Sequence, residues 1–301
     1  RTGDLAWAAG DMRARGFLLG GTAGRTTLGG EGLQHQDGHS HLLSSTIPNC
    51  VSYDPCFGYE LAVIIHEGLR RMCVDQEDVF YYITVMNENY VQPRLPERQG
   101  VAQGTLRGMY LLQEGNPKPK LKVQLLGSGT ILREVIAAAK LLQDDFGIAA
   151  DVWSVTSFTE LRREGLAVER RNTLHPEERP RTCWVEECLD GRHGPVIAAT
   201  DYMRLYADQI RPFVRAPFKV LGTDGFEAVH ASSGLEGLAQ LTARRPDLML
   251  LDRTLPDIDG LDVCRKVRED RPELPIIMLT ARAEEMDVIV GLGAGADDYV
   301  P

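Results

Sequence analysis

The stretch KVQLLGSGTILREVIAAAKLLQDDFGIAADVWS, residues 122–154, decides the fold class. Lys122 to Leu126 has the composition of a buried strand, and the Gly-Ser-Gly-Thr that follows is typical of a turn into a helix. A helix is predicted over Ile131 to Phe146, because apolar residues recur there at helical spacing and Gly147 provides the stop. Ile148 to Ser154 is the next predicted strand. A strand, a helix and a strand in this order predict a parallel sheet covered by helices.

The same alternation extends on both sides of this stretch. Upstream, Leu61 to Arg71 (LAVIIHEGLRR) is helix-like, and Val79 to Val85 (VFYYITV) has the β-branched and aromatic residues of a buried strand. Downstream, Pro195 to Ala199 and Phe218 to Leu221 are predicted strands around a helix near Tyr202 to Ile210. The first 226 residues therefore predict an α/β fold.

The alternation restarts after Phe226. The elements predicted there are strands at 228–231, 248–251, 276–279 and 299–300 and helices at 234–244, 261–269 and 284–292. No helix separates the strands predicted at 218 and 228, although a parallel connection needs a crossover of about a dozen residues. Either an element is missing at this join, or the two strands belong to different domains.

Length and charge narrow the class of protein. The chain has 301 residues, which is about two domains of typical size. Its net charge is -10, and residues 227–301 carry 15 acidic and 8 basic side chains, so a nucleic-acid partner is not expected. No stretch approaches the roughly 18 apolar residues of a membrane span, and Arg1 to Leu5 lack the features of a secretory signal. We therefore expect a cytoplasmic protein without a membrane partner.

Several simple sites are excluded by spacing. The glycine-rich segment Gly20 to Thr27 is not a P-loop, because Leu19 stands where the first glycine should be and Arg25 replaces the lysine. His66 and Glu67 are not a zinc-protease motif, since Arg70 occupies the second histidine position. No two cysteines have C-x-x-C spacing, so we predict reduced thiols and no metal site. The six cysteines are at 50, 56, 73, 183, 188 and 264.

Three histidines and one aspartate fall within seven residues: His35, Asp37, His39 and His41. So dense a polar cluster could be a solvated loop. It could also bind a metal, because imidazole and carboxylate are good ligands, although the short spacing sets no tetrahedral geometry. We favour proton transfer and anion stabilisation beside a cofactor, because imidazole titrates near neutral pH.

Longer blocks resemble a known family. GEGLQHQDGHSHLLSSTIPNCVSYD at 30–54, VFYYITVMNENY at 79–90, KVQLLGSGTILREV at 122–135 and FKVLGTDGF at 218–226 are similar to the homodimeric pyruvate dehydrogenase decarboxylating component, a thiamine diphosphate enzyme. The resemblance covers residues 1–226. It implies the end of a pyrimidine-binding domain, then a linker and a transketolase-like carboxy-terminal domain. The expected ranges are 1–85, 86–118 and 119–224.

The resemblance also implies a reaction. The family oxidatively decarboxylates pyruvate and transfers the acetyl group to the lipoyl domain of the acetyltransferase component, as a homodimer. The resemblance places Asp37, Gly38 and His41 near the substrate carbonyl, and it implies that His39 and His35 are their neighbours in the catalytic set.

The cofactors implied are thiamine diphosphate and Mg2+. The family's pyrophosphate motif, Gly-Asp-Gly with an asparagine about 30 residues on, does not occur, because Thr223 precedes Asp224 and Gly225. The glutamate that activates the aminopyrimidine is expected before Arg1. We therefore predict no cofactor-binding residues here and no decarboxylase activity for the lone chain.

A second family begins at Gly225. LMLLDRTLPDIDGLDVCRKVR at 248–268, LPIIMLTAR at 274–282 and GLGAGADDYV at 291–300 resemble a truncated response-regulator receiver domain over 225–301. The resemblance implies an incomplete flavodoxin-like domain that accepts a phosphoryl group from a histidine kinase on Asp252. Thr280 would contact the phosphoryl group, and Tyr299 would be the aromatic switch.

The receiver family also uses Mg2+, held partly by an acidic pair at the end of its first strand. That strand and pair are not in this sequence, and the family's lysine would lie just beyond Pro301, so Asp252 keeps only some of its partners. Three functions remain open: a fragment of the thiamine-dependent enzyme, a signalling receiver phosphorylated on Asp252, and a chimera with neither activity. The fold class expected is α/β, with a transketolase carboxy-terminal-like parallel or mixed sheet and an incomplete receiver.

Overall fold

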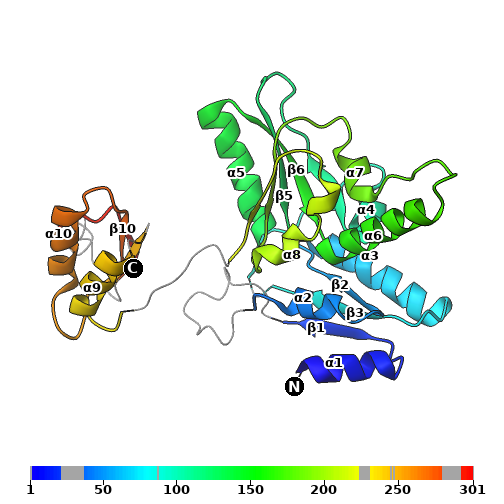
Figure 1. Cartoon of the computed structure of the whole chain (residues 1–301), viewed down its shortest axis with the longest axis horizontal. Helices are drawn as coiled ribbons and strands as arrows, with labels where there is room; N and C mark the ends of the chain where they lie inside the picture. Colours follow the sequence, from blue (N-terminus) through cyan, green and yellow to red (C-terminus); the bar gives the residue numbers. More distant parts are fainter. Residues whose placement is uncertain are drawn as a thin grey trace. The chain divides into compact units, whose positions relative to one another are not determined.

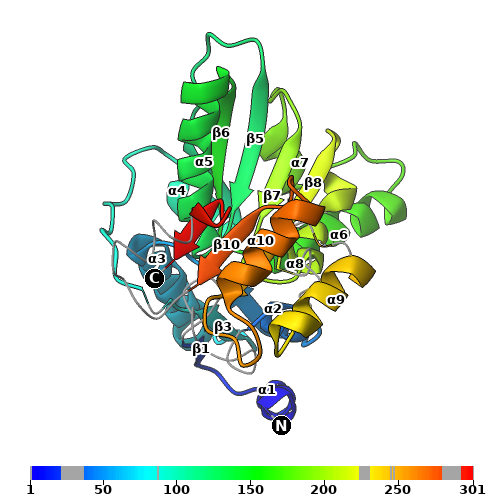
Figure 2. The ribbon, with the colours of Figure 1, turned by 90° about the vertical axis from the view of Figure 1, so that its left-hand side faces the viewer.

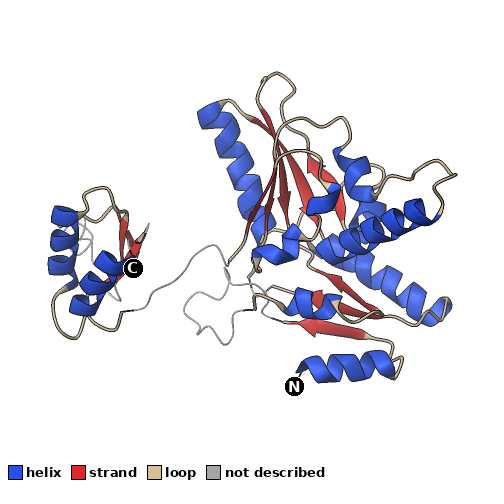
Figure 3. Cartoon of the chain, viewed as in Figure 1, coloured by secondary structure: helices blue, strands red, loops and turns tan. Residues whose placement is uncertain are grey.

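The computed structural model confirms the α/β class (Figures 1 and 3). It describes residues 2–21, 37–86, 88–223, 231–244, 246, 248–279 and 293–300. The chain divides into two compact units, Arg1–Phe226 and Glu227–Pro301, which are described separately below. No helix in the described ranges is both long enough and apolar enough to cross a membrane.

The larger sheet of the first unit has five strands in the order β4-β6-β5-β7-β8. Its strands are β4 (Met109–Gln113), β5 (Lys122–Gly127), β6 (Ala149–Val155), β7 (Val196–Ala199) and β8 (Phe218–Leu221). Every pair is parallel except β4 with β6, so the sheet is mixed. The strands predicted at 122–126, 148–154, 195–199 and 218–221 are confirmed.

Helices cover both faces of this sheet (Figures 2 and 3). On one face lies α5 (Ile131–Phe146), which has the predicted bounds and ends at Gly147 with φ 63°. On the other lie α6 (Phe158–Leu174) and α7 (Trp184–Leu189). Each face has its own buried apolar cluster, so the sheet is closed on both sides. A short helix, α8 (Arg204–Asp208), follows β7 within the region predicted as helical.

A smaller parallel sheet precedes it, in the order β1-β3-β2. Its strands are β1 (Phe17–Gly20), β2 (Cys50–Tyr53) and β3 (Phe80–Thr84), and its helices are α1 (Thr2–Asp11), α2 (Ser40–Ser45) and α3 (Gly58–Leu69). A π-helical turn, Arg70–Val74, continues α3. The predicted helix at 61–71 and strand at 79–85 are confirmed within a few residues.

The interval 86–118, predicted to be a linker, contains regular structure in its second half. Residues 101–107 form α4 (Val101–Arg107), and β4 adds an antiparallel edge strand to the five-stranded sheet. Burial of Val101 and Met109 shows that its second half belongs to the core.

A buried carboxylate joins the two sheets of the first unit. Glu60, in the first turn of α3, accepts hydrogen bonds from the Tyr110 hydroxyl of β4 and the Ser154 hydroxyl of β6, both at 2.6 Å. It also accepts the backbone N–H groups of Cys56 at 2.7 Å and Phe57 at 2.9 Å. Burial raises the pKa of Glu60, and four donors compensate its charge. The small sheet is thereby held to the large one.

The second unit has three parallel strands in the order β11-β10-β9. Its elements are α9 (Gly234–Arg244), β9 (Met249–Asp252), α10 (Gly260–Asp270), β10 (Ile276–Leu279) and β11 (Asp298–Val300). The helix predicted at 284–292 and most of the strand predicted at 228–231 lie outside the described residues. Since β8 pairs with β7 in the first unit, the strands predicted at 218 and 228 fall in different domains.

Candidate functional site

The carboxyl ends of the two sheets meet in the first unit. Asp54 follows β2 and Thr84 ends β3, while Gly129 follows β5. The backbone of Asp54 bridges them, because its N–H donates to the Thr156 carbonyl at 2.7 Å and its carbonyl accepts the Gly129 N–H at 3.0 Å. Ligands of α/β proteins bind at such carboxyl ends, so this junction is the candidate site.

His41 lies at the centre of this junction. Its side chain is fully buried on α2, and its ring lies 4.8 Å from the ring of Tyr206, 4.9 Å from that of Tyr202 and 5.3 Å from that of Tyr82. Burial lowers the pKa of His41 to about 4, although the negative charge of Asp37 acts in the opposite direction and raises it. The imidazole is therefore neutral near pH 7.

A hydrogen-bond chain fixes the protonation pattern of His41. Its Nε2 lies 3.0 Å from the Thr84 hydroxyl, which donates to Asp54 Oδ1 at 2.7 Å. A threonine hydroxyl has one proton, so while it donates to Asp54 it accepts from the imidazole. His41 then carries its proton on Nε2. Its Nδ1 is a buried acceptor that has no hydrogen-bond partner in the described part of the chain.

Asp54 is the residue that sequence reasoning missed. Burial raises the pKa of Asp54 to about 7, and the charge of Asp201 adds to this increase. The hydrogen bond from Thr84 acts in the opposite direction and lowers the pKa. Gly129 has φ 49°, and a Cβ on it would lie 2.5 Å from Asp54 Oδ2, so the carboxyl group packs against bare backbone. An aspartate after a strand is a common sequence pattern. Asp54 differs from other such aspartates only because two sheets meet around it in the folded chain.

The other members of the histidine cluster are placed differently. The Asp37 carboxylate accepts the N–H of His39 at 3.1 Å and that of Ser40 at 2.9 Å, as well as the Ser40 hydroxyl, and so holds the loop that leads into α2. His39 is exposed. The Gly38 carbonyl accepts the Met203 N–H at 2.9 Å, which fixes this loop to the segment after β7. His35 lies outside the described residues.

In the second unit, Asp252 is exposed at the carboxyl end of β9, and its Oδ1 accepts the Thr254 N–H at 2.9 Å. Two nearby carboxylates hold helix ends. Asp257 accepts the N–H groups of Gly234 and Leu235, which lowers its pKa to about 2, and Asp259 caps α10. Thr280 and the side chain of Tyr299 lie outside the described residues.

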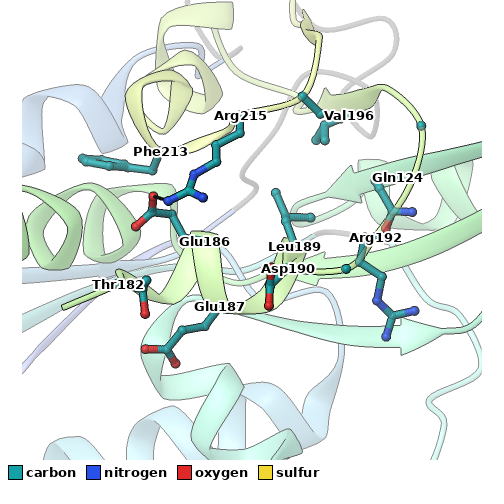
Figure 4. Close-up of a pocket in the computed structure, with 13 residues that line it drawn as sticks. Gln124, Thr182, Glu186, Glu187, Leu189, Asp190, Arg192, Val196, Phe213 and Arg215 are labelled. Carbon is teal, nitrogen blue, oxygen red and sulfur yellow. Dashed lines mark hydrogen bonds and ion pairs between the residues drawn. The ribbon is translucent and has the colours of Figure 1, made fainter. Parts of the chain in front are cut away.

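A separate cleft of about 510 Å³ opens near the amino ends of β5 and β7 (Figure 4). Arg215 pairs with Glu186 at 2.9 Å there, and Arg192 pairs with Glu114 at 3.0 Å and Asp151 at 3.2 Å. The two arginines are thus neutralised within the fold. This end of the sheet is opposite the carboxyl ends, and we assign no site to it.

One group of three metal-ligating side chains occurs among the described residues. His175, Glu177 and Glu178 lie together just after α6, and all three are exposed. Glu178 already pairs with Arg171. This group is separate from the His41 junction and is not a predicted metal site.

Comparison with known proteins assigns the first unit. Residues 1–93 match the Pyruvate dehydrogenase E1 component middle domain, and residues 108–235 match the Transketolase-like TK C-terminal domain. The pyruvate dehydrogenase E1 component of Pseudomonas aeruginosa is 70% identical over 227 residues, which are 75% of this chain and 26% of that protein. The Escherichia coli K12 component is 57% identical over 230 residues, 75% of this chain and 25% of that protein. The chain thus spans about a quarter of the length of these relatives.

Residues 205–301 match the Response regulator receiver domain. Among solved structures, the receiver domain of NtrX from Brucella abortus is 28% identical, with TM-score 0.25, over 26% of this chain and 66% of that one. A transketolase variant from Pichia stipitis is 16% identical, with TM-score 0.45, over 70% of this chain and 26% of that one.

The chain thus matches two classes of α/β protein in succession. Its first unit resembles a segment of a pyruvate dehydrogenase E1 component, and its second unit resembles a response-regulator receiver domain. Both expected resemblances are confirmed. The finer limits at 85, 118 and 224 stay predictions.

Proposed function

We propose that residues 2–223 form the substrate-side wall of a site for thiamine-dependent decarboxylation of pyruvate, within a homodimer that passes the acetyl group to a lipoyl domain. The observation that carries the proposal is the buried His41, whose Nδ1 has no hydrogen-bond partner among the described residues, where the carboxyl ends of parallel strands from two sheets meet. The match to pyruvate dehydrogenase E1 components supports the reaction.

Different roles follow for His39 and His41, the two histidines of the cluster that the structure describes. His39 is exposed, so its imidazole can exchange a proton with a bound substrate. His41 is neutral and fully buried, so it acts as a hydrogen-bonding group that shapes the wall. Asp37 is a positioning residue, because its carboxylate holds the backbone of the loop that carries both histidines. A role for His35 stays a prediction.

Relatives of this kind imply thiamine diphosphate and Mg2+, and the described residues do not suit the charged part of that cofactor. The junction places Asp37 and Asp201 near the buried Asp54, and carboxylates repel a diphosphate. The group at His175 is exposed and separate from the junction. We infer that parts of the longer enzyme outside this chain bind the diphosphate and Mg2+, and we expect no decarboxylase activity from the chain alone.

A graft tests the proposal. Residues 1–223 replace the matching segment of the Pseudomonas aeruginosa relative, and release of CO2 from carboxyl-labelled pyruvate is measured with thiamine diphosphate and Mg2+. We expect activity in the graft and a loss of about a hundredfold in His39→Gln, the scale of one general acid or base. His175→Gln, another exposed histidine, is the matched control and should leave the rate unchanged. A folded graft that releases no CO2 would contradict the proposal.

A second candidate function is phosphoryl acceptance in the second unit. The observation in its favour is the exposed Asp252 carboxylate at the carboxyl end of β9, in a stretch that matches the receiver family. Acetyl phosphate with Mg2+ should add one phosphoryl mass to the full chain, and Asp252→Asn should abolish the adduct. Absence of the adduct, under conditions that label an intact receiver, would refute phosphorylation and with it a kinase partner.

A further inference from the structure

Within the described ranges, β9 is an edge strand of the receiver-like sheet. β9 pairs with β10 on one side, and no strand of the described ranges pairs with its other side. The N–H groups of Met249 and Arg253 donate to carbonyls of the β10 segment at 2.9 Å and 3.1 Å. Because peptide groups alternate along a strand, the N–H groups of Leu248, Leu250 and Asp252 point away from β10.

The same strand exposes large apolar side chains. Leu250 is 60% exposed, Leu248 44% and Leu279 on β10 36%. Leu251 and Met278, which alternate with them, are buried in the core under α9 and α10. The described helices therefore cover one face of the sheet, and the leucines lie on the other.

We propose that β9 pairs with β9 of a second copy of this chain, so that two three-stranded sheets join edge to edge. Two identical strands related by a two-fold axis are antiparallel, because the same surface must serve both partners. A pairing centred on Leu250 sets each Leu250 opposite its equivalent and Leu248 opposite Asp252. The central Leu250 pair is apolar, and an apolar cross-strand pair stabilises a sheet.

Charge favours this register. Asp247 and Arg253 flank the strand in sequence, and the pairing centred on Leu250 sets an aspartate opposite an arginine at each end. Asp247 enters only through its sequence position, since its placement lies outside the described residues. The other edge strand, β11, is only three residues long, begins with Asp298 and follows Asp297, features that discourage edge pairing. The second copy is therefore expected at β9.

Hydrogen exchange of the full chain tests this pairing at the strand itself. At two protein concentrations about a hundredfold apart, the amides of 248, 250 and 252 should exchange more slowly in the concentrated sample. The amides of 249, 251 and 253 bond to β10, so they should be protected at both protein concentrations. Their protection shows that the unit is folded. Dimerisation through the first unit would leave the β9 amides unchanged.

Two variants sharpen the test. The dissociation constant of the dimer follows from how this protection depends on protein concentration. Leu250→Lys should raise that constant at least about tenfold, because a lysine on an edge strand opposes pairing. Leu235→Lys is the matched control, since Leu235 on α9 is 58% exposed and lies off the strand, and it should behave as the parent chain. Fast exchange at 250 in the concentrated sample, protection independent of concentration, or an unaffected Leu250→Lys would each overturn the proposal.

Discussion

Among the described residues, the two units differ in how completely their sheets are covered. The five-stranded sheet of the first unit has a buried apolar cluster on each face, whereas the described part of the three-stranded sheet of the second has one cluster, under α9 and α10. Glu60 in the first unit and Arg268 in the second each connect several segments. Glu60 is fully buried, while Arg268 keeps 22% of its side chain exposed. Desolvation, more than the number of hydrogen bonds, should therefore decide how much each residue contributes to the free energy of unfolding.

The largest effect is expected at Glu60. Glu60→Ala leaves the hydroxyls of Tyr110 and Ser154 and two backbone N–H groups without their acceptor in a buried site. We expect a loss of about 3–5 kcal/mol in the free energy of unfolding of the first unit, measured by urea denaturation. Glu67→Ala, at a partly exposed site on the same helix, is the control and should cost less than about 1 kcal/mol. Equal losses in the two variants would remove the contrast between buried and exposed charges.

A pH-dependent effect is expected at Asp54. Its folded pKa of about 7 lies above the ordinary 3.8, so the folded state keeps a proton that the unfolded state loses between these values. Stability from this group is therefore complete below pH 4 and is lost as the pH rises to 7. His41 opposes it, because its folded pKa of about 4 makes stability rise between pH 4 and 6.5.

Asp54→Asn removes one of these two opposed contributions. The unfolding free energy of the parent chain minus that of Asp54→Asn should fall by a few kcal/mol, in order of magnitude, between pH 4 and 7. Urea denaturation at a series of pH values gives the comparison. A difference that does not change with pH would show that Asp54 does not titrate in this range.

A smaller effect separates two glycines with positive φ. Gly147, with φ 63°, has open space around its missing Cβ, whereas a Cβ on Gly129 would meet the Asp54 carboxyl group at 2.5 Å. Gly147→Ala should cost about 1 kcal/mol from backbone strain alone, and Gly129→Ala about 1–2 kcal/mol more from the clash. Thermal unfolding of both variants measures this difference. If the two costs are equal, the junction is less tightly packed than the structure indicates.

The smallest effect is expected in the second unit. Arg268 donates to the carbonyls of Gly295, Pro272 and Leu274, each at 2.7 Å, and pairs with Asp297 at 2.6 Å. Because solvent can replace part of this network, Arg268→Ala should cost about 1–2 kcal/mol, read from hydrogen exchange of β10. Arg265→Ala, at an exposed pair on the same helix, should stay within about 0.5 kcal/mol. A larger loss than that of Glu60→Ala would reverse the comparison.

Local periodicity explains which elements could be predicted. The α5 helix has a regular apolar face and a glycine stop, so its bounds follow from the sequence. The α6 helix was not predicted because most of its residues are polar. Its signal is the pair Ser157 and Glu160, in which the Ser157 side chain accepts the Glu160 N–H as an N-cap. Short-range patterns thus suffice for strongly amphipathic segments and fail where only a cap marks the start.

The candidate site shows a different limit. Asp37, His39 and His41 could be singled out because they lie close together in the chain. Asp54 and Thr84 are 30 residues apart, and each follows or ends a strand in an ordinary way. Only the tertiary meeting of β2, β3 and β5 brings these groups into one network. The shifts in pKa depend on that burial and have no counterpart in the sequence.

The Glu60 network has a consequence for where such a gene can recombine. A crossover between residues 86 and 109 that brought in unrelated sequence would separate Glu60 from Tyr110 and Ser154, two of its four donors. A crossover after residue 223 leaves the carboxylate and all four donors on the same side. Selection for a folded product should therefore remove junctions of the first kind and tolerate those of the second. The boundary between the two units lies at Phe226, on the tolerated side.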